Sequence, residues 1–397
     1  MNTPRRSCEV CAMSRLFIAN CRLFDSPQRP VSISVRDGLI EGIGDLLPPP
    51  HVEVLEAGGR IVAPGFIDLH VQGAGGGDVL DGTVEALQAI SRTCARFGVT
   101  GFLATTVFRP GGDNRHLEVA ARCVGEDLGG ARLLGIHIEG PFISPKKRGM
   151  ILPDCICPPS ERVLDEITSL TGGSLRMMTI APELEGSLRI VERLVEGGVV
   201  ASLGHTNASY EEALEGIRAG ISHVTHLFNA MTPFHHREPG ALLAVLESEG
   251  VTAQIITDGV HIHPRVIKWA FKLLGEGRCI PITDGMRAMG LPEGRYIYSG
   301  VEYEVRDGVA RYVADGTLIG TALGLNEMVR RLMDFTGCGL EAAIKTATEN
   351  PARVLGLEGK LGRIGVGAHA DLVILEEDLS VWATVVGGKV VFRAEGG

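Results

Sequence analysis

From about Arg60 to Met286 the chain repeats one unit, in which a short apolar run rich in β-branched residues is followed by a glycine-marked or polar loop and a helix-length segment. This alternation is typical of consecutive βα units. Because eight such units can close on themselves, the pattern predicts a (β/α)8 barrel. The eight runs end near FIDLHV, GFLATTV, LLGIHIEGPF, RMMTIAP, VVASLGHT, HVTHLFNAM, AQIITDGVHIH and CIPITDGM.

Three segments follow a different pattern, one near the start of the chain, one inside its last third and one at its end. VSISVRDGLIEGIG, VEYEVRDGVARYV and VWATVVGGKVVFR alternate apolar and polar residues around Asp-Gly or Gly-Gly pairs, which predicts hairpins. Strands at both ends cannot belong to the parallel barrel, so we expect them to pair in one small, discontinuous β-sandwich. The predicted division is an N-terminal tail at 1–14, the sandwich at 15–62 and 365–397, and the catalytic barrel at 63–364.

Composition excludes several classes of protein. The net charge of -10 opposes a nucleic-acid partner, and Lys146–Arg148 is the one basic cluster that stands out. No apolar stretch approaches a membrane span, and the start of the chain has no apolar export signal. Nine scattered cysteines indicate reduced thiols and a cytoplasmic protein. Cys8-x-x-Cys11 is interpreted as part of an N-terminal extension rather than as a zinc or redox site.

Four polar residues end predicted barrel strands, where catalytic groups of such barrels lie. They are Glu139, His205, His226 and Asp284. Each alone would more often be an ordinary hydrogen-bonded strand end. Together, two imidazoles and one carboxylate from three strands predict a site for one divalent metal ion with a position left open.

Asp284 fits the remaining role in a metal-assisted hydrolysis. Its carboxylate could take a proton from water and pass it to the leaving nitrogen of an amide. The alternative is that Asp284 caps a helix beside Gly285. His137 lies two residues before Glu139, deeper in its strand, and is expected to be held by hydrogen bonds rather than to bind the ion.

The loops that follow two other strands are rich in hydrogen-bond donors. HLFNAMTPFHHREPG contains Asn229 and Arg237, and TDGVHIHP contains His261. Arginine binds phosphate through two parallel hydrogen bonds, so these loops favour a phosphorylated substrate, although an arginine in a loop is usually just solvated.

In this order and spacing, HIEGPF, GHT, THLFNAM, REPG, DGVHIHP and ITDG resemble the N-acetylglucosamine-6-phosphate deacetylase family of the amidohydrolase superfamily. The resemblance runs from about Leu16 to Arg393. It implies a barrel beside a β-sandwich and a metal-dependent enzyme that removes acetate from an N-acetylated amino-sugar 6-phosphate.

The resemblance also assigns roles to residues. It implies that Glu139, His205 and His226 bind the metal and that Asp284 is the acid and base. Arg237 and His261 correspond to residues that hold the sugar phosphate, one or both in the neighbouring subunit's site, which implies a homodimer. Three further positions correspond to residues of the substrate pocket, namely Gly140, Asn229 and Ala230.

The sequence departs from the family at two places. Members with two metals carry His-x-His on the first strand, whereas this chain has His70 and Gln72. Gln72 offers only a neutral amide oxygen, so we expect a single ion, with His70 lining the pocket or making a weak second site. After SPKKR the family places a histidine that contacts the acetamide carbonyl, but this chain reads Gly149-Met150-Ile151. Loss of such a donor puts the substrate in question.

Three functions therefore compete. The first is deacetylation of an N-acetylhexosamine 6-phosphate, with glucosamine favoured over galactosamine. The second is another amidase or deaminase reaction of the same superfamily. The third is a non-catalytic sugar-phosphate-binding barrel, against which Asp284 argues because a structural metal site needs no acid or base at its open position. Zinc is the expected ion, and ferrous iron accepts the same ligands.

Overall fold

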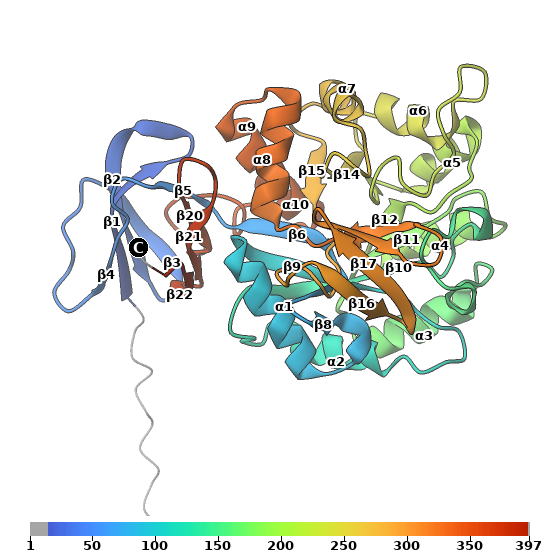
Figure 1. The fold of residues 1–397 in the computed structure, drawn as a ribbon, viewed down its shortest axis with the longest axis horizontal. Coiled ribbons are helices and arrows are strands. Elements are labelled where there is room, and N and C mark those ends of the chain that lie inside the picture. The colour runs from blue at the N-terminus through green and yellow to red at the C-terminus, as the bar shows by residue number, and fades with distance from the viewer. Residues whose placement is uncertain (1–14, 396–397) are drawn as a thin grey trace, which may run out of the picture.

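A computed structural model describes residues 15–395. Its larger part is the predicted barrel, formed by eight parallel strands in the order β15-β14-β13-β12-β11-β10-β9-β6 (Figure 1). All eight apolar runs named above supply one strand each. The strands are β6 (Phe66–Val71), β9 (Val99–Thr106), β10 (Arg132–Glu139), β11 (Leu175–Ile180), β12 (Val200–Leu203), β13 (His223–Val224), β14 (Thr252–Ile256) and β15 (Cys279–Ile282).

The first and last barrel strands close the ring through backbone and side-chain contacts. Val71 and Gly285 form a parallel bridge just beyond β15. Deeper in the barrel, the hydroxyl of Thr283 donates to the carboxylate of Asp68 at 2.6 Å, and both residues are buried. The carboxyl ends of β6 and β15 are therefore held side by side.

Helices surround this ring, and their caps follow from the sequence. Thr83 caps the first helix, and Ser209 and Glu212 form a capping box at the fifth. Pro351 lies in the first turn of the last helix, where a missing N–H costs nothing. The helices are α1 (Val84–Arg96), α2 (Arg115–Cys123), α3 (Glu161–Thr171), α4 (Ser187–Glu196), α5 (Tyr210–Ala219), α6 (Gly240–Glu247), α7 (Pro264–Leu274), α8 (Leu325–Thr336), α9 (Leu340–Thr346) and α10 (Glu349–Val354).

Strands from both ends of the chain form the smaller domain, at the left of Figure 1. β5 joins the two groups, since it pairs with β1 on one side and with β20 on the other. Leu16 and Ile33 from the first group share an apolar core with Leu372 and Trp382 from the second. The strands are β1 (Arg15–Leu23), β2 (Ser26–Arg36), β3 (Leu39–Gly44), β4 (Glu53–Glu56), β5 (Ile61–Pro64), β20 (Leu372–Leu375), β21 (Val381–Val386) and β22 (Lys389–Arg393).

The discontinuous domain and the hairpins thus agree with the sequence pattern, although the hairpin of β17 (Val301–Arg306) and β18 (Val309–Tyr312) belongs to a separate sheet. The three predicted hairpin turns have left-handed backbone at the expected pairs, for example at Asp37 and Gly38 with φ of 50° and 78°. The domain boundaries at 15–62, 63–364 and 365–397 stay a prediction. The tail at 1–14, with Cys8 and Cys11, lies outside the described residues.

A four-stranded antiparallel sheet follows β15 and lies beside the barrel. It consists of β16 (Gly294–Tyr298), β17 (Val301–Arg306), β18 (Val309–Tyr312) and β19 (Leu318–Thr321), and the short pair β7 (Gly73–Ala74) and β8 (Gly77–Asp78) follows β6. Thr321 is bridged to Gly285, so this sheet is attached directly to the end of β15. Among the described residues, no helix is long and apolar enough to cross a membrane.

Candidate metal centre and active site

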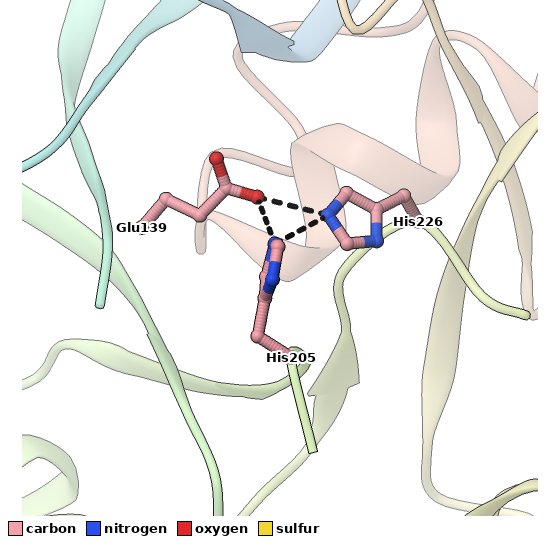
Figure 2. A group of neighbouring side chains, drawn as sticks. All are labelled: Glu139, His205 and His226. Atoms are coloured by element: carbon pink, nitrogen blue, oxygen red, sulfur yellow. Dashed lines mark hydrogen bonds and ion pairs between the residues drawn. The ribbon is translucent and has the colours of Figure 1, made fainter. Parts of the chain in front are cut away.

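Glu139, His205 and His226 meet at the carboxyl ends of β10, β12 and β13 (Figure 2). Glu139 Oε1 lies 2.9 Å from His205 Nε2 and 2.8 Å from His226 Nε2, and the two nitrogens are 3.1 Å apart. All three residues are buried. Three atoms that can bind a metal therefore face one another at the mouth of the barrel.

The spacing and chemistry of these atoms fit one divalent ion. Tetrahedral bonds of about 2.0–2.2 Å would place ligand atoms roughly 3.3–3.6 Å apart, slightly wider than the triangle here. His205 Nδ1 donates to the main-chain oxygen of Lys147 at 2.8 Å, which leaves Nε2 with its lone pair toward the triangle. His226 Nδ1 has no partner among the described residues.

The protonation states also suit a metal site. Burial lowers the pKa of His226, which favours the neutral imidazole that a metal requires. Burial alone would raise the pKa of Glu139, but His70, His205 and His226 together hold it well below its usual range. The site thus presents a carboxylate with at least one neutral imidazole.

Several residues at or after these strand ends have strained backbone. His205, His226, Ala230 and Asp284 all have positive φ, at 47°, 29°, 52° and 48°. Residues other than glycine rarely adopt this region, and such strain is typical of functional sites held in place by their surroundings. Gly140, with φ of 94°, follows Glu139 in a conformation that favours glycine.

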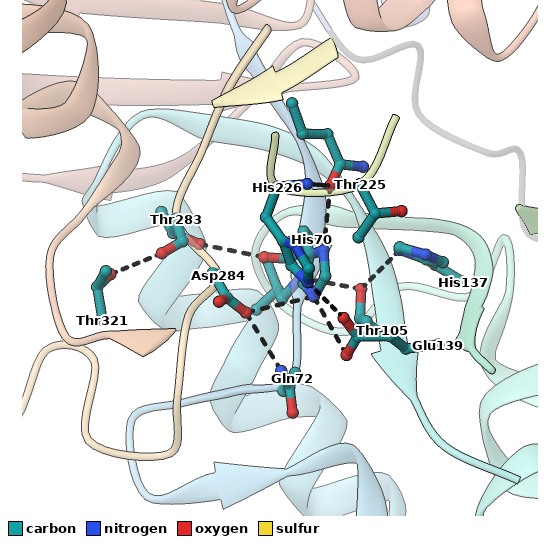
Figure 3. A network of polar contacts seen from close by, with 12 residues as sticks. His70, Gln72, Thr105, His137, Glu139, Thr225, His226, Thr283, Asp284 and Thr321 are labelled. Carbon is teal, nitrogen blue, oxygen red and sulfur yellow. Dashed lines mark hydrogen bonds and ion pairs between the residues drawn. The ribbon is translucent and has the colours of Figure 1, made fainter. Parts of the chain in front are cut away.

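Asp284 lies beside the triangle and contacts the two residues of the His-x-Gln pair (Figure 3). Its Oδ1 accepts a hydrogen bond from Gln72 Nε2 at 3.2 Å and lies 3.3 Å from His70 Nε2. Burial alone would lower the pKa of His70, but the carboxylates of Asp284 and Glu139 raise it to about 9. The next helix begins at Leu325, so Asp284 does not cap a helix.

His137 is satisfied by hydrogen bonds below the site. Its Nε2 lies 2.8 Å from Thr179 Oγ1, and its Nδ1 lies 3.3 Å from the main-chain oxygen of Leu69. Burial lowers its pKa well below the usual range, so the ring is neutral. These contacts occupy both ring nitrogens, as expected for a residue that supports the site rather than binding an ion.

Sequence patterns did not single out two buried polar residues that hold the site together. Asp68 accepts hydrogen bonds from the main-chain nitrogens of His70 and Thr283, at 3.2 and 3.4 Å. Gln254 Oε1 lies 3.1 Å from His70 Nδ1 and accepts from the main-chain nitrogen of His226 at 3.3 Å. The sequence does show a charged or amide residue within an apolar barrel strand at each position. Burying such a residue costs free energy unless it is hydrogen-bonded, and this could have pointed to both.

The segment around Met150 contains apolar side chains where the family resemblance implies a histidine. Met150 is buried against Met286 and Tyr298, and its main-chain oxygen accepts from the hydroxyl of Tyr312 at 3.2 Å. Ile151 belongs to a separate apolar cluster with Ile143. The four-stranded sheet after β15 therefore packs onto this segment.

The residues predicted to contact the substrate lie in loops around the mouth. Asn229 donates from Nδ2 to the main-chain oxygen of His226 at 3.2 Å, so it is attached to the metal-site strand. His261 Nδ1 donates to Asp258 at 2.6 Å, which fixes its ring. Arg237 is exposed and its Nη1 lies 2.7 Å from His236 Nε2. Arg237 thus lies at the surface of the chain.

Comparison with known proteins places the chain in a family. The Amidohydrolase family profile matches residues 61–391. An N-acetylglucosamine-6-phosphate deacetylase of Bacillus subtilis is 37% identical over 91% of this chain and 92% of its own length. An N-acetylgalactosamine-6-phosphate deacetylase of Escherichia coli O157:H7 is 34% identical over 90% of this chain and 94% of its own.

A solved structure supports the same relationship. It is an aspartate-to-alanine mutant of the N-acetyl-D-glucosamine-6-phosphate deacetylase of Mycobacterium smegmatis in complex with N-acetyl-D-glucosamine-6-phosphate. It matches with a TM-score of 0.88 and 32% identity over 96% of this chain and 100% of its own. The chain therefore belongs to the N-acetylglucosamine-6-phosphate deacetylase family of amidohydrolases.

Proposed function

We propose that this enzyme hydrolyses the acetamide of N-acetylglucosamine 6-phosphate to acetate and glucosamine 6-phosphate, with one divalent ion bound by Glu139, His205 and His226. The observation that carries the proposal is the convergence of these three ligand atoms within 4.8 Å of one another at the barrel mouth. When bound, such an ion polarises the amide carbonyl and activates water.

The residues around the ion have complementary tasks. Asp284 takes a proton from the attacking water and returns it to the nitrogen as the C–N bond breaks. Its position beside the ligand triangle supports this role, as does its strained backbone with φ of 48°. Gly140, Asn229 and Ala230 line the pocket for the sugar.

A single ion, zinc or ferrous iron, is the proposed cofactor. The first strand carries Gln72 in place of a second histidine, and its amide nitrogen faces Asp284. An amide is a weak ligand beside two imidazoles and a carboxylate. His70 is proposed to line the pocket or to make a weak second site.

The phosphate is proposed to bind Arg237 and His261, with one or both supplied by the partner of a homodimer. Arg237 is exposed on a loop, and among the described residues its side chain contacts only His236. Such an arginine is available to a substrate bound in a neighbouring subunit. A cytoplasmic location is supported by the seven cysteines of the described residues, all of which are free.

A second candidate substrate is the galactosamine epimer, since one relative at 34% identity is named an N-acetylgalactosamine-6-phosphate deacetylase. Metal analysis of the purified protein should be combined with acetate release from both epimers, each with and without the 6-phosphate. We expect one ion per chain and turnover that depends on the phosphate. About two ions per chain would contradict the single-ion proposal, and absence of acetate from every substrate would contradict deacetylation.

A further inference from the structure

Gln72 and Asp284 are joined by a buried hydrogen bond that the reaction described above does not require. Gln72 Nε2 donates to Asp284 Oδ1 at 3.2 Å, and the two residues are 3% and 7% exposed (Figure 3). Only the NH2 end of an amide can donate to a carboxylate. The nitrogen of Gln72, which cannot bind a cation, is therefore the end directed at Asp284.

The backbone of Gln72 is fixed on both sides. Its N–H donates to the main-chain oxygen of Gly285 at 2.9 Å, and its C=O accepts from Val79 N–H at 2.9 Å. Gly285 directly follows Asp284 in the sequence. The backbone of Gln72 is therefore bonded to the neighbour of Asp284, while the side chain of Gln72 contacts the Asp284 carboxylate. The side chain of Gln72 thus starts from a position that is rigid relative to Asp284.

Asp284 needs such support, because its carboxylate can otherwise rotate. Its main chain is held by Thr321 N–H, which donates to the Asp284 oxygen at 2.9 Å. The side-chain contacts from Gln72 and His70 both fall on Oδ1. Oδ2 is then the oxygen that can accept a proton from water and return it.

We propose that Gln72 is a positioning residue that orients the Asp284 carboxylate by donating to Oδ1, and that it is not a metal ligand. The proposal rests on the proposed function, in which Asp284 transfers the proton. A glutamine at this position gives the carboxylate a neutral hydrogen-bond donor without a second ion. Small errors in the placement of a catalytic group can cost about a hundredfold in rate.

The test compares Gln72→Met, which keeps the length of the side chain but removes the donor, with Thr106→Val as a control. Thr106 is another buried residue at a strand end, and its hydroxyl has no partner among the described residues. We expect Gln72→Met to lower kcat about tenfold to a hundredfold and to change KM less than about threefold. The number of ions per chain should not change, and Thr106→Val should match the wild type.

A double-mutant cycle separates an action through Asp284 from a general disturbance of the site. In an Asp284→Asn background, measured with enzyme in excess over substrate, adding Gln72→Met should cause no further loss of rate. An additional loss equal to that in the wild-type background would overturn the proposal. If Gln72→Met fails to fold, Gln72→Asn keeps the polarity but is too short for the same contact, and the same results are expected.

Three further outcomes distinguish a failure of the positioning role from a failure of the proposed function. An unchanged kcat in both Gln72 variants would overturn the positioning role and leave the deacetylase proposal intact. A drop in bound metal on replacing Gln72 would show that it is a ligand and would also overturn the proposal. Absence of acetate release by the wild type would instead contradict the proposed function itself.

Discussion

His205 donates from Nδ1 to the main-chain oxygen of Lys147 at 2.8 Å, and this contact ties the loop after β10 to the metal site. Two residues further along, Gly149 has φ of 55° and its backbone passes close to the same imidazole. A Cβ at Gly149 would lie 3.3 Å from His205 Cε1. The loop and the ring are therefore packed with little free space between them.

Gly149→Ala should weaken metal binding. The new methyl group would displace the His205 ring by a few tenths of an ångström, and disturbed ligand support typically costs about tenfold or more in metal affinity. Gly172→Ala is the matched control, because Gly172 has a nearly identical φ of 54° but no atom within 4 Å of its Cβ position. Both variants should lose about 1–2 kcal/mol of stability from the positive φ.

Metal affinity, measured by competition with a chelator, distinguishes the two variants. Equal losses of affinity in Gly149→Ala and Gly172→Ala would mean that the contact with His205 has no effect on the ion.

Glu139→Gln should lose most of the bound metal and lower kcat/KM by about a hundredfold or more. Even the loss of residues that only support the ligands lowers metal affinity or activity by about tenfold to a hundredfold. His137→Asn is the control on the same strand. It removes the 2.8 Å contact with Thr179 and should cost about 1–3 kcal/mol of stability, yet keep one ion per chain. Metal analysis and thermal unfolding measure both effects, and loss of the ion from His137→Asn would identify His137 as a ligand.

Asp68 should make the unfolding free energy depend on pH. Burial raises the pKa of its carboxyl from 3.8 to about 6. The folded chain then binds this proton more tightly than the unfolded chain does. The contribution to stability is therefore fully present below about pH 4 and is lost as the pH rises through about 6. Its full size is about 3 kcal/mol.

Asp68→Asn removes this titration and isolates it. Denaturant unfolding of the metal-free wild type and variant should be measured at several values between pH 4 and pH 7. We expect the difference in unfolding free energy between the two proteins to change across this range in favour of the wild type at low pH. A difference that stays constant would contradict the raised pKa.

The strand ends could be predicted from sequence because each depends on local pattern. An apolar run followed by a polar residue marks the end of a barrel strand, and parallel strands in a barrel bring those ends together. For this reason the sequence predicts that Glu139, His205 and His226 lie together, and in the structure their ligand atoms are within 4.8 Å of one another. The hairpins at Asp-Gly pairs were accessible in the same way.

Contacts across the barrel closure could not be predicted, because no local pattern specifies them. Asp68 is hydrogen-bonded to Thr283, 215 residues later in the sequence, and Gln254 contacts His70, 184 residues earlier. The sequence shows only that a polar residue interrupts an apolar strand. Its partner follows from the register in which β6 meets β15, which depends on the packing of the whole barrel. The orientation of the Gln72 amide is fixed by the same closure.

If the active site is shared between two subunits as proposed, two impaired variants should complement each other. Arg237→Ala should raise KM for the phosphorylated substrate about tenfold to a hundredfold, because a hydrogen bond to a charged group is lost. Asp284→Asn should abolish proton transfer while the ion stays bound.

Co-expression with two different affinity tags allows purification of the dimer that contains one subunit of each kind. In that dimer, if Arg237 acts across the interface, the intact Asp284 of one subunit faces the intact Arg237 of the other. One of its two sites is then complete, so we expect about half the wild-type activity at a substrate concentration near the wild-type KM. If Arg237 instead serves its own subunit, every site in the mixed dimer carries a defect and the activity stays low. A monomeric protein in solution would contradict the shared site directly.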